Sequence, residues 1–181
     1  MRNMLIGDNI KLGSLNMSDM EYISSWFNDV EFLRYYDMVP AIPKSQKDML
    51  KLLEYYESSE DKQIFAVRLL HSNTIIGIAG FDDILWSNGV ATTFIGIGSK
   101  ESKGKGLGKE TMRLLLDFGF NELNFHRIQL NVISYNSAAI SLYESVGFKK
   151  EGTYRDFIYR DGKRYDLYLY GLLKSEWDLL S

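Results

Sequence analysis

The 181-residue chain lacks several kinds of residue and segment that would point to particular functions. It has no cysteine, which excludes a disulfide framework, a thiolate nucleophile and a zinc–thiolate site. Its two histidines argue against a metal site built on imidazoles, so we assign no metal ligands. There are only two prolines, and no apolar run approaches the length of a membrane span. This composition is typical of a globular protein with one core.

Charge of one sign is not in large excess either. The 21 basic and 24 acidic side chains give a net charge of −3, so there is no reason to expect a nucleic acid as partner, and a cationic substrate is mildly favoured. Residues 1–8 contain no apolar run long enough for a signal peptide. We therefore expect a cytoplasmic protein of one domain, residues 1–181, that has no membrane partner.

The most informative segment is the glycine-rich turn between Ser99 and Glu110. It places Gly104, Gly106 and Gly108 among four lysines, after a β-branched apolar run and before an amphipathic helix. Glycine has no Cβ and tolerates positive φ, so backbone N–H groups can gather around an anion, and the helix N-terminus adds further unpaired N–H groups. The segment therefore predicts a phosphate site, with a solvated loop as the alternative interpretation.

Two better-known phosphate motifs do not fit this turn. A P-loop ends in Gly-Lys-Ser/Thr, whereas Gly108-Lys109 is followed by Glu110, which leaves no hydroxyl for magnesium. A dinucleotide fingerprint needs GxGxxG spacing, which the three glycines do not have. The predicted phosphate site is therefore of neither kind.

Apolar periodicity predicts an alternation of strands and helices along the chain. A βαβ unit is expected in the middle of the chain, and its two strands should be parallel. It consists of the strand Val90–Ile97, the glycine turn, a helix over 108–123 and a strand over His126–Ile133. Asp161-Gly162 is the favoured pair for a type I′ hairpin. We interpret Val30–Pro43 as a helix–helix connection packed on the core, or as a loop that carries function. The other expected elements are strands over 9–15, 64–70, 74–81, 154–160 and 164–171, helices over 18–28, 46–57 and 136–147, and a helical tail at 175–177.

Asn136 and Tyr143 are seven residues apart in a predicted helix, so two helical turns bring them to nearly the same face. A helix cap and a core tyrosine would explain the pair. Alternatively, a tyrosine near the phosphate-binding turn could donate its proton to a leaving group, because an ordinary pKa of about 10 keeps it protonated at neutral pH. The spacing leaves both interpretations open.

The chain resembles a GNAT-type N-acetyltransferase over essentially its whole length. The resemblance lies in the order of the expected elements and in the segments Lys103–Glu110 and Asn136–Phe148. The closing Arg160–Asp166 hairpin is similar to that of the family's branch of ribosomal-protein-type and polyamine-type enzymes. The resemblance implies an α/β (α+β) fold, with a central mixed, mostly antiparallel sheet of about seven strands flanked by about four helices.

The resemblance also implies which residues bind acetyl-CoA. The family's pyrophosphate loop falls on Lys103, Gly106 and Gly108, where Lys103 keeps a cation without the planar geometry of the usual arginine. The strand before the loop would pair with the pantetheine arm, and Tyr143 matches the usual general acid for the departing thiolate. The implied cofactor-binding residues are Phe94, Ile95, Ile97, Lys103, Gly104, Lys105, Gly106, Leu107, Gly108, Lys109, Asn136 and Tyr143.

The implied reaction is direct transfer of the acetyl group from acetyl-CoA to a primary amine, which must lose a proton to react. Many relatives have a glutamate on the strand before the loop, where this chain has Thr92. The base is therefore unassigned, with Asp82 and Asp83 as candidates. Because that glutamate is missing, a CoA-binding module without chemistry is the alternative function.

The acceptor is not determined by these motifs. Scaffolds of this type serve protein N-termini, polyamines, aminoglycosides and small amino compounds, with selectivity in segments such as Phe32–Met38 and Arg155–Arg164. A homodimer is common among similar proteins, and it is one possible assembly here.

Overall fold

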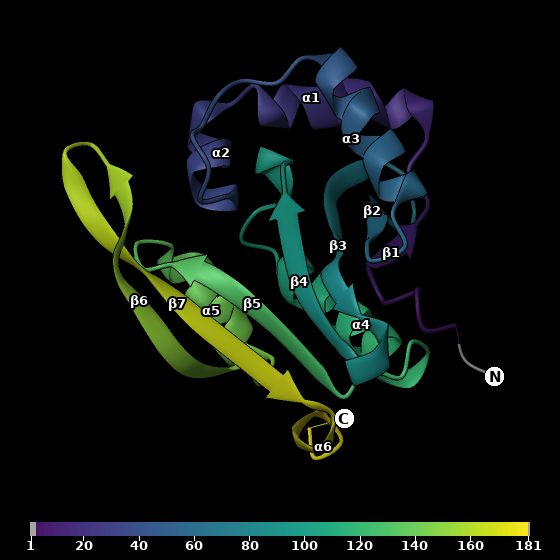
Figure 1. Ribbon diagram of the computed structural model, residues 1–181. Coiled ribbons are helices and arrows are strands. Elements are labelled where there is room, and N and C mark those ends of the chain that lie inside the picture. The colour runs from purple at the N-terminus through teal and green to yellow at the C-terminus, as the bar shows by residue number, and fades with distance from the viewer. Residues whose placement is uncertain (1–2, 181) are drawn as a thin grey trace.

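The structure is a computed structural model that describes residues 3–180. The described residues form one seven-stranded sheet in the order β1-β2-β3-β4-β5-β7-β6 (Figure 1). The strands β4 and β5 are parallel, as the βαβ pattern predicts, and the other neighbouring strands are antiparallel. The strands are β1 (Ile10–Gly13), β2 (Gln63–Leu69), β3 (Ile75–Leu85), β4 (Val90–Ile97), β5 (Arg127–Ile133), β6 (Lys149–Arg160) and β7 (Lys163–Leu173).

Six α-helices accompany the sheet in the described part of the chain, more than the sequence predicts. None of the helices in residues 3–180 combines the length and the hydropathy that crossing a membrane requires. The helices are α1 (Met20–Phe27), α2 (Val30–Tyr36), α3 (Gln46–Ser58), α4 (Leu107–Asn121), α5 (Ser137–Ser145) and α6 (Lys174–Trp177).

The helix α2 shows that the interpretation of Val30–Pro43 as a connection is wrong for its first half. The Oδ1 atom of Asp29 caps this helix by accepting hydrogen bonds from the N–H groups of Glu31 at 2.9 Å and Phe32 at 3.4 Å. The rings of Phe32 and Tyr36 stack with centroids 5.3 Å apart. A helix of seven residues is shorter than the window over which apolar periodicity is informative. Whether this segment is helical therefore depends on its capping residue and on its packing.

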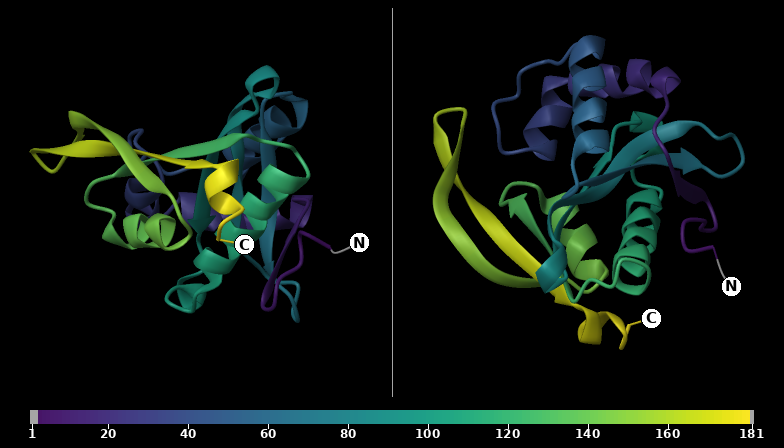
Figure 2. Two further views of the ribbon diagram at one scale, coloured as in Figure 1. Left: turned by 90° about the horizontal axis from the view of Figure 1, so that it is seen from below. Right: turned by 45° about the vertical axis from the view of Figure 1, so that its right-hand side comes forward.

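Helices cover both faces of the sheet around β3 and β4. The helices α4 and α5 pack on one face, where Leu116 and Ile128 belong to the larger core cluster. The helices α1, α2 and α3 pack on the opposite face, where Trp26 and Ile78 belong to a second cluster that reaches β4 through Phe94. The β6–β7 hairpin extends away from these layers (Figures 1 and 2). The strand β4 therefore lies between two helical layers, next to the less covered half of the sheet.

Two predictions about caps and turns are confirmed. The Oγ atom of Ser45 accepts a hydrogen bond from the N–H group of Asp48 at 3.2 Å and caps α3. Asp161 and Gly162 have φ values of 52° and 74°, the left-handed conformations of a type I′ turn between β6 and β7. Both features depend on neighbouring residues only, which is why the sequence reveals them.

Candidate active site

The site begins where β4 and β5 separate. The two strands pair only from Val90 to Thr92 of β4, and beyond this point they diverge (Figure 1). On its other side, β4 continues to pair with β3 as far as Ile97. Within residues 3–180, no strand pairs with the β5 side of β4 after Thr92. The backbone groups on that side are therefore open to another partner, which buried N–H and C=O groups generally require.

A cavity of about 570 Å³ occupies this opening between β4, β5, the glycine turn, α2 and α5. We call it the donor cavity after the role that we propose for it below. The predicted cofactor-binding residues that line it are Ile95, Ile97, Lys103, Gly104, Gly106, Leu107, Gly108, Asn136 and Tyr143. Phe94 lines a second cavity instead, and Lys105 and Lys109 line neither of the two.

The glycine turn has the backbone shape of an anion-binding turn. Gly104 and Gly106 have φ values of 73° and 77°, which residues with a Cβ rarely adopt. Gly106 is also the N-cap residue of α4, so the free N–H groups of the first helical turn begin beside the donor cavity. The arrangement can hold a phosphate through backbone N–H groups and the positive end of the helix dipole.

The acid in the first turn of α4 is directed elsewhere. The Oε1 atom of Glu110 accepts hydrogen bonds from the N–H groups of Asn9 at 2.7 Å and Ile10 at 3.2 Å. Burial acts to raise the pKa of Glu110, but these hydrogen bonds outweigh it and hold the pKa below its ordinary value. Its negative charge is thus held at the start of β1, and Glu110 does not line the donor cavity.

Asn136 and Tyr143 both line the donor cavity from α5. The Oδ1 atom of Asn136 accepts a hydrogen bond from the N–H group of Ala139 at 3.2 Å, which confirms the helix cap. The Tyr143 ring is buried against Phe148, with centroids 6.0 Å apart. Burial raises the pKa of Tyr143 to about 12, and its hydroxyl has no hydrogen-bond partner among residues 3–180. Tyr143 thus offers a protonated hydroxyl to whatever fills the cavity.

A second cavity of about 520 Å³ lies on the face of β4 that α3 covers, and we call it the acceptor cavity after the role that we propose for it below. Thr92 and Phe94 of β4 and Tyr56 of α3 line it. Two adjoining compartments are what a transfer between two bound substrates needs. The two cavities share the lining residues Tyr36, Asp37, Met38 and Asn131.

The two candidate bases lie in different surroundings. Asp82 lines the acceptor cavity together with Tyr56, and Nζ of Lys62 lies 3.3 Å from its Oδ1 atom. Burial, with smaller effects of Tyr36 and Asp82, raises the pKa of Tyr56, so the Tyr56 hydroxyl keeps its proton. Asp83 is exposed, has a φ of 49° and lines neither cavity. The structure therefore separates two candidates that are neighbours in sequence.

Tyr36 lies in the segment Phe32–Met38, to which the sequence assigned acceptor selectivity, but no chemical role was predicted for this residue itself. It lines both cavities from α2, and its ring lies against Gly96 of β4, where an added Cβ would be 2.7 Å from the ring. Burial raises the pKa of Tyr36 above its ordinary value. The signal that could have revealed it is the capping residue Asp29 followed by the i, i+4 pair of Phe32 and Tyr36.

Side chains from other elements hold the C-terminal end of α2 in place. The Tyr135 hydroxyl donates a hydrogen bond to the carbonyl oxygen of Arg34, and Nδ2 of Asn136 donates one to the carbonyl oxygen of Tyr35 at 3.1 Å. Beyond the helix, Nη2 of Arg160 on β6 donates to the carbonyl oxygen of Val39 at 2.8 Å. The β6–β7 hairpin and the β5–α5 loop therefore fix the wall that the two cavities share.

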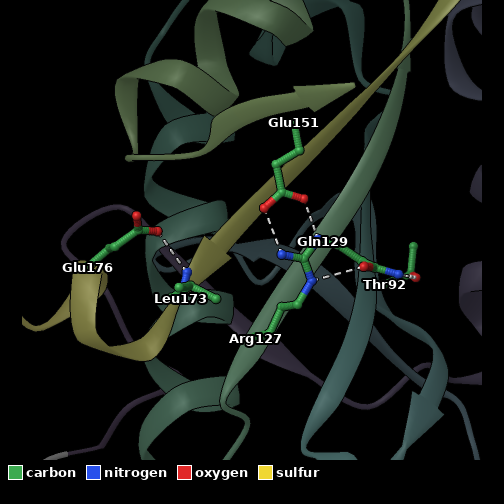
Figure 3. Close-up of polar contacts among 6 residues, drawn as sticks. All are labelled: Thr92, Arg127, Gln129, Glu151, Leu173 and Glu176. Atoms are coloured by element: carbon green, nitrogen blue, oxygen red, sulfur yellow. Dashed lines mark hydrogen bonds and ion pairs between the residues drawn. The ribbon is translucent and has the colours of Figure 1, made fainter. Parts of the chain in front are cut away.

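A series of polar contacts crosses the sheet and ends where β4 and β5 separate (Figure 3). Nη1 of Arg127 lies 2.7 Å from Oε1 of Glu151, and Nε of Arg127 donates to Oε1 of Gln129 at 3.1 Å. Nε2 of Gln129 in turn donates to Oγ1 of Thr92 at 3.5 Å. The Arg127 guanidinium holds the pKa of the Glu151 carboxyl below its ordinary value. These contacts connect β6 with β4.

Gly171 leaves room for this ion pair. Its strand β7 lies between β5 and β6, and a Cβ on Gly171 would be 2.4 Å from Oε1 of Glu151 and 2.7 Å from Nη1 of Arg127. Glu151 occupies a β-bulge, because the register with β7 shifts between Lys150 and Gly152. A bulge redirects a side chain, and here the Glu151 carboxylate lies above the backbone of β7.

Comparison with known proteins gives consistent matches over most of the chain. Residues 12–169 match the Acetyltransferase (GNAT) domain. The chain is similar to the uncharacterized N-acetyltransferase p20 of Bacillus licheniformis, with 29% identity over 96% of this chain and 97% of the relative. It is also similar to spermidine N(1)-acetyltransferase of Vibrio cholerae, with 26% identity over 93% and 95%. A solved structure of spermidine N-acetyltransferase from Vibrio cholerae in complex with CoA and spermine has a TM-score of 0.85 and 25% identity, over 93% of this chain and 97% of that one.

The chain therefore belongs to the GNAT acetyltransferase family. It is an N-acetyltransferase that uses acetyl-CoA as its acyl donor and amines as acceptors, similar to the polyamine-acetylating branch. These matches confirm the resemblance in the sequence and favour an enzyme over a CoA-binding module without chemistry. They confirm the expected mixed, mostly antiparallel sheet as well.

The substitution Gly171→Ala is expected to destabilise the protein, because the added methyl group would displace the Arg127–Glu151 ion pair. We expect the free energy of unfolding, measured by urea denaturation, to fall by up to about 1 kcal/mol, because the displaced ends of Glu151 and Arg127 are flexible and partly exposed. The matched control is Gly13→Ala in β1, where no atom lies within 4 Å of the added Cβ. The control should be neutral or stabilising by about 0.5 kcal/mol. Equal effects of the two substitutions would contradict this role of Gly171.

Proposed function

We propose that the protein acetylates a primary amino group of a polyamine or a similar alkylamine, with acetyl-CoA as the donor. The observation that carries the proposal is the acceptor cavity, which adjoins the donor cavity and places the Asp82 carboxylate near apolar side chains such as Ile78 and Leu52. An alkylamine suits these surroundings, because its methylene groups pack on apolar walls and its charged nitrogen pairs with a carboxylate. The spermidine acetyltransferases among the relatives support the same class of acceptor.

The donor cavity fits the pyrophosphate of acetyl-CoA at the glycine turn. The open backbone of Gly104 and Gly106 and the first N–H groups of α4 would hold its charged oxygens. The Lys103 side chain, which lines the cavity, would add a cation. Lys105 and Lys109 line neither cavity, so they would contribute backbone N–H groups only.

The free side of β4 fits the pantetheine arm. When bound, acetyl-CoA supplies an acetyl group activated as a thioester. From Phe94 to Ile97 the backbone of β4 would pair with amide groups of the arm, much as another strand would. The Phe94 side chain faces the acceptor cavity, so on the donor side it would act through its backbone, as would Ile95. Asn136 caps α5 and would contribute to the wall of the cavity.

In this proposal, Tyr143 and Asp82 each carry out a different proton transfer. The amine nitrogen forms a bond to the carbonyl carbon, the carbon–sulfur bond breaks with its electron pair moving to sulfur, the nitrogen loses a proton and the sulfur gains one. Tyr143 donates the proton to sulfur and later recovers one from solvent. Asp82 pairs with the cationic amine and accepts, directly or through a water molecule, the proton whose loss makes the nitrogen nucleophilic. The second proton, which the nitrogen loses after the new bond forms, passes to solvent.

The acceptor class is tested with a panel of spermidine, spermine, an aminoglycoside and a peptide with a free N-terminus, each incubated with acetyl-CoA. We expect monoacetylated spermidine or spermine as the main product, because both combine methylene segments with primary amines. Products are identified by mass spectrometry, and release of the CoA thiol without an amine gives the background. Acetylation of the peptide alone would contradict a polyamine acceptor.

The role of Asp82 is tested with Asp82→Asn, which removes the charge and keeps the shape of the side chain. We expect kcat/KM for the best amine to fall by about 100-fold, in the range typical of a lost general base. The matched control is Asp83→Asn, since Asp83 is the exposed neighbour and asparagine tolerates its positive φ. The control should keep its activity, and similar losses in both variants would exclude the specific role of Asp82.

The role of Tyr143 is tested with Tyr143→Phe, which keeps the buried ring and removes the hydroxyl. We expect kcat to fall by about 100-fold, while the dissociation constant of CoA stays unchanged. Activity that needs protonated Tyr143 is lost only as the pH rises through about 12, so the loss should be uniform across the pH range in which the enzyme is assayed. Tyr154→Phe on the exposed face of β6 is the control. A Tyr143→Phe enzyme with unchanged kcat would contradict the assignment.

A further inference from the structure

We infer that Tyr36 is a further catalytic residue, whose hydroxyl donates a hydrogen bond to the carbonyl oxygen of the acetyl group during transfer. The inference rests on the proposed function, in which acetyl transfer takes place where β4 and β5 diverge. It does not depend on which amine accepts the acetyl group. Tyr36 keeps its own proton throughout, so no additional reactant is needed.

The first support is the position of Tyr36 between the two cavities. A bond between the amine and the acetyl carbon has to form where the two compartments meet, and Tyr36 lines both of them. Among the other residues on the shared wall, Asp37 carries a carboxylate, Met38 has no side-chain donor and Asn131 lies on β5, across the opening. Tyr36 therefore presents the hydroxyl donor on the β4 side of this wall.

The second support is that the ring has little freedom to move. It stacks on Phe32 with centroids 5.3 Å apart and makes an edge contact with Phe27 at 5.1 Å. On its other side it lies against the backbone of Gly96, where any Cβ would approach it to 2.7 Å. A donor that is already oriented stabilises developing charge without reorganisation during the reaction.

The third support is that the Tyr36 hydroxyl is unused and protonated. It has no hydrogen-bond partner in the part of the chain that the structure describes. Burial is the main cause that raises the pKa of Tyr36, and the nearby Asp37, Asp82 and Tyr143 add to it. Tyr36 is thus near both groups to which we assign proton transfers, and it remains a donor at the pH at which they act.

These observations define a chemical role that differs from that of Tyr143. As the amine nitrogen attacks, the electron pair of the carbonyl double bond moves onto oxygen, and that oxygen gains negative charge. A hydrogen bond from Tyr36 would stabilise this charge, whereas Tyr143 would deliver a proton to sulfur when the carbon–sulfur bond breaks. The contact of Tyr36 with Gly96 places it beside β4, the strand that would bind the donor.

The deciding measurement uses acetyl-CoA isotopically labelled at the carbonyl carbon and bound to the enzyme without amine. A hydrogen bond to the carbonyl oxygen lowers its stretching frequency in the infrared spectrum. We expect the band in Tyr36→Phe to lie at higher frequency than in the unmodified enzyme. Tyr143→Phe, which removes a hydroxyl assigned to sulfur, should leave the band in place. An unshifted band in Tyr36→Phe would overturn the inference, whatever happens to turnover.

Kinetic measurements give a second readout. We expect Tyr36→Phe to lower kcat by about 100-fold, with the dissociation constant of CoA within about twofold of its original value, as for loss of a preorganised oxyanion donor. Tyr22→Phe on the exposed side of α1 is the control and should leave both values unchanged. An unchanged kcat in Tyr36→Phe, or a loss explained by weaker CoA binding, would overturn the inference.

A further variant tests whether the position of the ring matters. Gly96→Ala would place a methyl group 2.7 Å from the Tyr36 ring and displace it, so the carbonyl band should shift in the same direction as in Tyr36→Phe. An unshifted band with a folded Gly96→Ala enzyme would contradict the role of this contact. Because the infrared experiment contains no amine, failure of every polyamine in the panel would overturn the proposed acceptor alone.

Discussion

The whole site depends on the early end of the pairing between β4 and β5. Three paired positions, ending at Thr92, join the two halves of the sheet before the strands diverge. The contact between Thr92 and Gln129 lies at this last position. Past it, β4 has a partner on one side only, and in a sheet an open row of N–H and C=O groups is a template for an added strand. An amide-containing ligand can take that place, and helices on both faces of β4 keep the opening narrow.

The helix α2 closes one end of this opening, and it could hardly exist without the rest of the fold. Isolated helices much shorter than about 12 residues are unstable in water, so α2 depends on its contacts. Its carbonyl groups and those that follow are bound by Tyr135, Asn136 and Arg160, which belong to the β5–α5 loop and to β6. Its aromatic side packs on Gly96 of β4. Elements from both halves of the sheet thus bring Tyr36 to the shared wall of the two cavities.

Much of the fold could be predicted because its signals are local. The bounds of Val90–Ile97 match β4, and Ser45 and Asp161-Gly162 act as the cap and the turn that their residue types favour. The error at Val30–Pro43 has a physical reason, since most of what stabilises α2 lies far away in sequence. The same reason separates Asp82 from Asp83, because neither their spacing nor their chemistry shows which one faces a cavity.

By itself, the sequence determined the glycine turn, the cap of α5 and the family. The backbone preference of glycine and the side-chain chemistry of Asn136 act within a few residues, so their effects can be predicted without knowledge of the fold. Only the tertiary structure decided that Tyr36, Asp82 and Tyr143 would line two adjoining cavities. They lie on α2, β3 and α5, and their meeting depends on sheet register and helix packing, which no local pattern contains.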